Sequence, residues 1–212
     1  MEIVLVVGFG PFPGAPRNPS AELVQSLGKR RRPALADTRV VTAVLPTSYA
    51  AVRDELPRLL KQHEPNAVLF FGLASRTRFL RIERRAVNAV TGFYPDAARV
   101  KSETRSFMPG MPAELRVRAD VLRLAVAARS AGIDARLSRD AGRYICNAAL
   151  YRALHAARQD GKPRLVAFVH IPRPRRRARL DAKPGRFRPT QAMLVRAGEA
   201  VLVALAAQAR RS

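Results

Sequence analysis

Short apolar runs alternate along the chain with longer segments in which apolar residues recur at helical spacing. Five short runs are mostly apolar at consecutive positions, which is typical of strands covered on both faces of a sheet. These runs span residues 3–7, 39–45, 67–72, 135–137 and 165–170. Helical spacing occurs in residues 20–27, 48–63, 115–131, 147–158 and 191–210. The alternation predicts an α/β fold, a single three-layer α/β/α domain over residues 1–212 with a mostly parallel central sheet.

Residues that favour the ends of helices support these boundaries. Asn18 or Ser20 can cap the first helix, and Thr47 or Ser48 can cap the second. Gly132 can end the third helix in a left-handed conformation. Two further segments, residues 92–112 and 173–189, follow neither pattern and contain several prolines. We expect both to be long irregular loops, a kind of segment that is often functional.

Charge is the unusual part of the composition. The 212 residues include 39 Lys and Arg but only 16 Asp and Glu, which gives a net charge of +23. Such a chain should associate nonspecifically with polyanions at low salt. The basic clusters at 29–32 and 173–179 are not interleaved with aromatic residues, and no known nucleic-acid-binding signature is found. We interpret the charge as a solvated surface, with a binder of nucleic acid or anionic membrane as the alternative.

The same composition bears on location. No run reaches about 18 uncharged apolar residues, so we expect no membrane span. The apolar run at residues 3–7 is too short for a signal peptide and lacks a basic segment before it. A single cysteine in 212 residues then predicts a cytoplasmic protein.

Cys146, that single cysteine, lies between a predicted strand and a predicted helix. It can form neither an intrachain disulfide nor a cysteine-rich metal site, so it is either a small buried hydrophobe or a nucleophile. A helix beginning at Cys146 or Asn147 would direct free N–H groups and the positive end of its dipole at the sulfur. That arrangement favours the thiolate and can stabilise an oxyanion.

Partners for a cysteine nucleophile stand near the ends of two other predicted strands. His170 ends the run at 165–170, and Glu83 follows the run at 67–72. Taken singly, His170 fits a satisfied core histidine and Glu83 fits a surface ion pair with a neighbouring arginine. Taken together with Cys146, they supply the base and the orienting acceptor that a cysteine nucleophile requires.

The first predicted strand leads into a loop rich in glycine and proline that also contains Phe9 and Phe12. A Gly-x-Gly after a strand suggests dinucleotide binding, but prolines remove the backbone donors of a phosphate cradle and the helix starts only later. We therefore reject a dinucleotide site. Phe9 and Phe12 either pack under the loop as minor core or line a pocket.

These motifs together resemble the pyroglutamyl peptidase I family of cysteine peptidases, also called pyrrolidone-carboxylate peptidases. The resemblance runs nearly end to end and preserves the order Glu, Cys, His. It is carried by Gly8-Phe9-Gly10-Pro11-Phe12, Asn18-Pro19-Ser20, Gly72-Leu73-Ala74, Glu83-Arg84, Ala86-Val87-Asn88, Ala131-Gly132-Ile133, Tyr144-Ile145-Cys146-Asn147 and Phe168-Val169-His170-Ile171-Pro172.

The resemblance implies an enzyme that removes N-terminal pyroglutamyl residues from peptides without a metal or cofactor. Cys146 would attack the pyroglutamyl carbonyl, His170 would transfer the proton, and Glu83 would orient the imidazole. Phe9 and Phe12 match the aromatic residues that flank the lactam ring, whose two apolar faces suit such a slot. The matched motifs add two further substrate-binding candidates, Asn18 and Leu73. A homo-oligomer is compatible with the sequence.

The chain also departs from the family pattern. Arg143 stands where the family usually has Thr, and Phe93 stands where it commonly has an arginine near the active site. These changes motivate an alternative hypothesis, a family member with weakened activity or with activity on another blocked or lactam-like substrate. The net charge of +23 motivates another, a non-catalytic polyanion-binding protein on the same scaffold.

Overall fold

A computed structural model describes residues 1–175 and 187–212 of the chain. Its central sheet has six strands in the order β2-β1-β3-β8-β4-β7. The pairs β2–β1, β1–β3, β3–β8 and β4–β7 are parallel, and only β4 runs antiparallel to its neighbour β8. The strands are β1 (Glu2–Phe9), β2 (Thr38–Leu45), β3 (Ala67–Leu73), β4 (Leu80–Glu83), β7 (Ala135–Ser138) and β8 (Leu165–Ile171).

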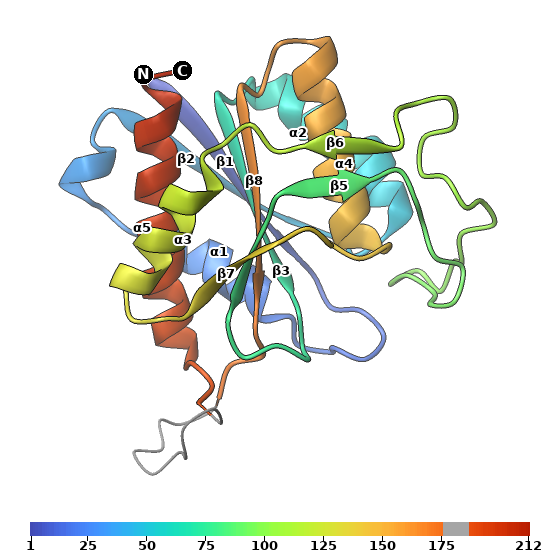
Figure 1. The fold of residues 1–212 in the computed structure, drawn as a ribbon, viewed down its shortest axis with the longest axis horizontal. Coiled ribbons are helices and arrows are strands. Elements are labelled where there is room, and N and C mark those ends of the chain that lie inside the picture. The colour runs from blue at the N-terminus through green and yellow to red at the C-terminus, as the bar shows by residue number, and fades with distance from the viewer. Residues whose placement is uncertain (176–186) are drawn as a thin grey trace.

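Helices cover both faces of this sheet, which confirms the three-layer prediction (Figure 1). One layer holds α1 (Pro19–Gly28), α3 (Val121–Ser130) and α5 (Gln191–Ala209); the other holds α2 (Leu56–His63) and α4 (Ile145–Gln159). Consecutive apolar positions serve both layers, because Val4 and Val6 pack toward α1 and α5 while Leu5 and Val7 pack toward α2 and α4. The mostly continuous apolar runs of the predicted strands follow from this double coverage.

The five predicted strands are confirmed, but β4 was not predicted. β4 is only four residues long and half of it is charged, so it lacks the apolar run of its neighbours. Leu80 and Ile82 pack in the core, and the alternate residues Arg81 and Glu83 face the other way. The strand is held by its pairing with β7 on one side and β8 on the other.

Two predicted helices begin later than expected or change geometry. Residues 114–116 form strand β6 (Glu114–Arg116), which pairs with β5 (Arg85–Val87) in a separate two-stranded sheet beside α4. α3 begins only after Asp120, whose side chain accepts hydrogen bonds from the N–H groups of Leu122 and Arg123. The predicted helix at 48–63 is a π-helical turn, Ala51–Glu55, continued by α2.

Only the first of the two predicted loops lies wholly within the described residues. Residues 92–112 are irregular, as expected. Most of residues 173–189 lies outside the described residues.

α5 is the most apolar helix and has the length and composition of a membrane span, although 56% of its apolar window is buried inside the protein. It packs against α1 and α3 and against three strands, β1, β3 and β8. Its buried Glu199 accepts two hydrogen bonds of 2.7 Å from Arg32. These contacts are those of the core helix of an α/β domain.

Candidate active site

The carboxyl end of β3, the start of α4 and the end of β8 meet at one point of the sheet. His170 is the next-to-last residue of β8 and pairs in register with Gly72 of β3. Cys146 is the second residue of α4. A Cβ atom on Gly72 would lie 2.8 Å from Cys146 Sγ and 2.8 Å from the Phe168 ring. The bare glycine therefore lets the cysteine sulfur lie directly over the end of β3.

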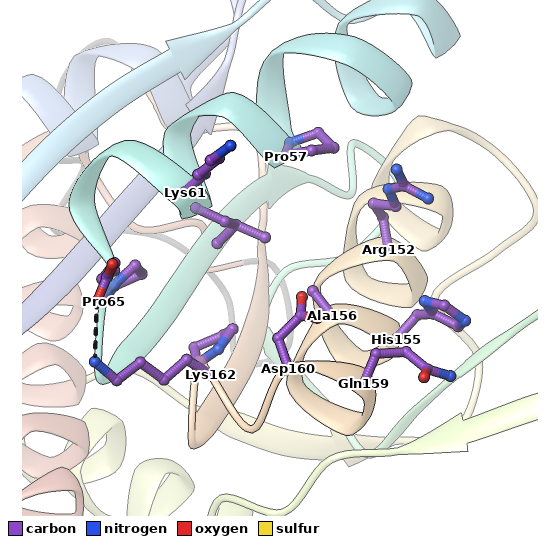
Figure 2. A pocket seen from close by; sticks show the side chains of 12 residues that line it. Pro57, Lys61, Pro65, Arg152, His155, Ala156, Gln159, Asp160 and Lys162 are labelled. Carbon is purple, nitrogen blue, oxygen red and sulfur yellow. Dashed lines mark hydrogen bonds and ion pairs between the residues drawn. The ribbon is translucent and has the colours of Figure 1, made fainter.

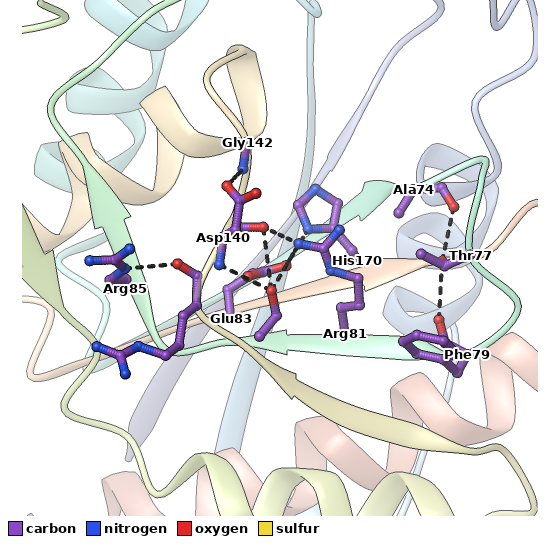
Figure 3. Close-up of polar contacts among 11 residues, drawn as sticks. Ala74, Thr77, Phe79, Arg81, Glu83, Arg85, Asp140, Gly142 and His170 are labelled. Carbon is purple, nitrogen blue, oxygen red and sulfur yellow. Dashed lines mark hydrogen bonds and ion pairs between the residues drawn. The ribbon is translucent and has the colours of Figure 1, made fainter.

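Glu83 reaches the same point from β4, of which it is the last residue. Its Oε1 lies 2.8 Å from His170 Nδ1, as Figure 3 shows. The Glu83 side chain is fully buried and only 5% of His170 is exposed. A buried carboxylate at this distance accepts a hydrogen bond from the Nδ1–H group and fixes both the tautomer and the orientation of the ring.

His170 also interacts through a hydrogen bond with Cys146, which leaves the imidazole between a sulfur and a carboxylate. Burial alone would lower the pKa of His170, but the hydrogen bonds and negative charges of Cys146 and Glu83 outweigh it and raise the pKa to about 9. The imidazole therefore carries a proton at neutral pH. Cys146, His170 and Glu83 are brought together in the order that the sequence predicted.

Arg81 extends this group, a residue that the sequence analysis did not single out. Its Nη2 lies 3.3 Å from Glu83 Oε1 and donates to Ser138 Oγ at 2.8 Å and to the carbonyl oxygen of Asp140 (Figure 3). Ser138 ends β7 and Asp140 lies in the loop that leads to Cys146. Arg81 thus connects the buried carboxylate to the segment that leads to Cys146. Its signal in the sequence was its position two residues before Glu83, which places both side chains on one face of a strand.

The first turn of α4 presents backbone donors beside the sulfur. The helix begins at Ile145, after an N-cap residue, Tyr144, that makes no side-chain capping bond. Its first backbone bond runs from the N–H of Ala148 to the carbonyl of Tyr144 at 3.0 Å. The N–H groups of Ile145, Cys146 and Asn147 precede that bond, as is usual for the first residues of a helix. They are suited to stabilising negative charge.

The two phenylalanines of the first loop occupy different environments. Phe9 is 1% exposed and stacks on Phe70 and Phe168, with ring centroids 6.4 and 6.2 Å away. The Phe168 ring lies in turn 4.7 Å from the His170 ring. Phe12 is partly exposed, and its ring lies 6.2 Å from that of Tyr144, two residues before Cys146.

Asn18 and Leu73, the other candidate substrate-binding residues, lie at the edges of this region. The Asn18 side chain accepts a hydrogen bond from Ser20 N and donates one to the carbonyl of Gly10 at 3.0 Å. It therefore caps α1 and also holds the Phe loop in place. Leu73 is the partly buried last residue of β3, paired in register with Ile171 of β8.

The segment that contains Phe93 is anchored to the residues that precede Cys146. The N–H of Thr91 donates to the carbonyl of Arg143 at 2.8 Å, and the Tyr144 hydroxyl donates to the carbonyl of Pro95 at 2.8 Å. Phe93 lies between these two anchors and is 86% exposed. No charged side chain occupies the position at which the family resemblance led us to expect an arginine.

A separate cavity lies away from these residues. It has a volume of about 750 Å³, lies between α2 and the second half of α4, and contains none of the three candidate catalytic residues (Figure 2). Its lining combines proline and aliphatic groups with polar and charged residues such as His155, Lys61 and Asp160. No group of three or more His, Cys, Asp or Glu residues that could hold a metal ion occurs in the described part of the chain.

Comparison with known proteins gives one consistent result. A family model described as pyroglutamyl peptidase matches residues 2–210. A pyrrolidone-carboxylate peptidase of Thermococcus kodakarensis is 35% identical over 169 residues, which is 80% of this chain and 80% of the relative. One of Deinococcus radiodurans is 34% identical over 173 residues, which is 81% of this chain and 78% of the relative.

Solved structures agree. The pyrrolidone carboxyl peptidase from Thermococcus litoralis superposes with a TM-score of 0.88 at 25% identity and covers all of this chain and 96% of its own. A mutant pyrrolidone carboxyl peptidase from Pyrococcus furiosus gives a TM-score of 0.86 at 27% identity, with 97% of this chain and 99% of the other covered.

Proposed function

The chain belongs to the pyroglutamyl peptidase family of cysteine peptidases, and from this premise we propose that it hydrolyses the bond after an N-terminal pyroglutamyl residue with Cys146, His170 and Glu83. The observation that carries the proposal is the placement of His170 between the Cys146 sulfur and the Glu83 carboxylate, 2.8 Å from the latter.

The proposed reaction follows from that placement. The Cys146 sulfur attacks the pyroglutamyl carbonyl carbon, and His170, which is protonated at neutral pH, gives its proton to the departing amine as the C–N bond breaks. A water then attacks the thioester, and the now neutral His170 takes the water proton, so that pyroglutamate leaves and the thiolate–imidazolium pair is restored. Glu83 keeps the ring aligned in both steps.

In this reaction, backbone N–H groups at the start of α4 stabilise the negative charge that develops on the substrate. As the carbonyl carbon becomes tetrahedral, its oxygen acquires negative charge close to Cys146. The N–H groups at the first turn of α4 lie before the first intrahelical bond and are free to donate to that oxygen. The sequence Tyr144-Ile145-Cys146-Asn147 thus provides both the nucleophile and its oxyanion donors.

Aromatic side chains form the proposed lactam slot. Phe12 is partly exposed beside Tyr144 and is placed to contact one face of a flat neutral ring. Phe9 supports the slot from the core through its contact with Phe168, which touches His170. Asn18 fixes the loop through Gly10, and Leu73 adds apolar surface at the end of β3.

Substrate selectivity tests this proposal. Purified protein should release the fluorophore from a pyroglutamyl-aminocoumarin amide but not from the matched prolyl amide, because proline has the same ring size, a free charged amine and no lactam carbonyl. Equal cleavage of both amides would show that the lactam is not what the site recognises.

One observation favours the second candidate, a weakened or shifted activity. Phe93 is 86% exposed and stands where the family resemblance places an arginine. If that arginine is needed for full activity, Phe93→Arg should raise kcat/KM on the pyroglutamyl amide. An unchanged or lower value would show that the site works without it.

We further propose that the protein is cytoplasmic and binds polyanions only through its net charge of +23. Binding to a random single-stranded DNA should then fall steeply between about 50 and 200 mM salt, without sequence preference. Binding that persists above about 200 mM salt with a preference for one sequence would instead support a dedicated nucleic-acid function.

A further inference from the structure

A small cavity lined by four arginines lies beside the catalytic group but outside it. Its volume is about 260 Å³, and its walls are the side chains of Arg84, Arg85, Arg116 and Arg139. Two valines, Val117 and Val121, complete the lining. None of the described residues that line it is acidic.

The backbone around this cavity is fixed by hydrogen bonds between segments distant in sequence. The N–H of Arg84 donates to the carbonyl of Ser138 at 2.8 Å, and its carbonyl accepts from the N–H of Val117 at 3.0 Å. Arg85 Nε donates to the carbonyl of Arg139 at 2.8 Å, a bond visible in Figure 3. The arginines therefore project from strand ends that are tied together rather than from one flexible loop.

Negative charge near the cavity is insufficient to balance these side chains. Glu114 is the acidic residue that pairs with them: it accepts from Arg85 and, at 3.1 Å, from Arg116 Nε. Hydrogen bonds from Arg85 and then Arg116 lower the pKa of Glu114, so it stays ionised. Within the described ranges, 1–175 and 187–212, the Arg84 and Arg139 guanidinium groups have no hydrogen-bond or ion-pair partner.

The four guanidinium groups, two of which share the single carboxylate of Glu114, leave an excess of three positive charges beside one cavity. Like charges that line one cavity repel one another, and a multivalent anion would relieve that repulsion. The planar fork of a guanidinium matches two oxygens of a phosphate, and arginine is the preferred side chain for this contact. We propose that the cavity binds a tetrahedral oxyanion, either free phosphate or the phosphoryl group of a small monoester.

The position of this arginine cavity links it to the catalytic group. Arg84 directly follows Glu83, and Arg139 lies in the segment between β7 and Cys146. An anion held by both would connect the strand that carries the orienting carboxylate to the segment that carries the nucleophile. Binding to the folded state alone raises the free energy of unfolding in proportion to the logarithm of anion concentration.

Thermal unfolding in potassium phosphate and in potassium chloride of equal ionic strength tests this proposal. We compare the wild type with the double variant Arg84→Gln/Arg139→Gln. The matched control, Arg30→Gln/Arg31→Gln, removes the same charge from an exposed basic cluster away from the cavity. Phosphate should raise the Tm of the wild type and the control by several degrees relative to chloride, and this rise should be lost in the cavity variant.

Two results would overturn the proposal: a rise of equal size in all three proteins, which would show the general stabilising effect of phosphate as a salt, or no rise over chloride in the wild type. If the double variant does not fold, Arg139→Gln alone takes its place, and its rise should be reduced. Glycerol 2-phosphate in place of phosphate distinguishes the sources: stabilisation by both identifies a phosphoryl site open to monoesters, and stabilisation by phosphate alone identifies a site for the free anion.

Discussion

The protonated state of His170 makes the stability of the protein depend on pH within a defined window. Burial would lower the pKa of this side chain, but Cys146 and Glu83 raise it from 6.5 to about 9. Replacing His170 with Gln retains a polar side chain of similar reach and removes the titrating group. The difference in unfolding free energy between wild type and His170→Gln therefore isolates the contribution of this proton.

The sign and size of this change in stability follow from the difference between the pKa values of His170 in the folded and unfolded states. Because the pKa in the folded state lies above that in the unfolded chain, the stabilisation is fully present below pH 6.5 and is lost as the pH rises through 9. The rise amounts to about 2.5 pH units, and each unit corresponds to about 1.4 kcal/mol, so the full effect is about 3 kcal/mol. An unperturbed histidine would contribute no such change.

Urea unfolding of both proteins between pH 6 and 10, in the presence of a thiol reductant, measures this effect. The difference in unfolding free energy between the wild type and His170→Gln should shrink by about 3 kcal/mol from pH 6 to pH 10. Most of this decrease should occur between pH 7 and 9. A difference that stays constant with pH would refute the reasoning, because it would mean that His170 is not held in its charged form by its two partners.

Three substitutions probe the rest of the site. Gly72→Ala would place a methyl group 2.8 Å from Cys146 Sγ and displace the sulfur. The value of kcat should therefore fall about 100-fold, while circular dichroism shows an intact fold. An unchanged kcat would mean that catalysis does not require the sulfur at this position. Glu83→Gln should lower kcat by up to ~10⁴-fold with little effect on KM, since the ring loses its orienting acceptor; a purely KM effect would contradict that role. Arg81→Ala should lower the unfolding free energy by about 2 kcal/mol because it removes one of the two cations beside the buried Glu83, the other being His170. Arg81→Lys should recover part of this loss, and equal stability of all three proteins would show that the ion pair contributes nothing.

The sequence was sufficient for the main sheet because five of its strands are covered on both faces and so read as apolar runs. β4 could not be found in this way: with two charged residues in four, it is identified only by its pairing with β7 and β8. Likewise, Leu115 continues the apolar spacing of the following helix, yet its pairing with β5 makes it part of a strand. Long-range pairing overrides local pattern in both cases.

The candidate catalytic residues could be predicted from the sequence because each stands at a strand end or a helix start, where parallel α/β folds place their functional side chains. Arg81 was missed because its role depends on contacts with Ser138 and Asp140, more than fifty residues away. The arginine cavity was missed for the same reason, since in a chain with 39 basic residues no local spacing distinguishes Arg84 from other arginines.

The measurement that tests the central claim most directly is the hydrolysis of a pyroglutamyl-aminocoumarin amide by the wild type and by Cys146→Ala. The account predicts clear turnover by the wild type and none above background by a folded Cys146→Ala variant. Turnover by both proteins would contradict the assignment of the nucleophile, and turnover by neither would contradict the proposed activity.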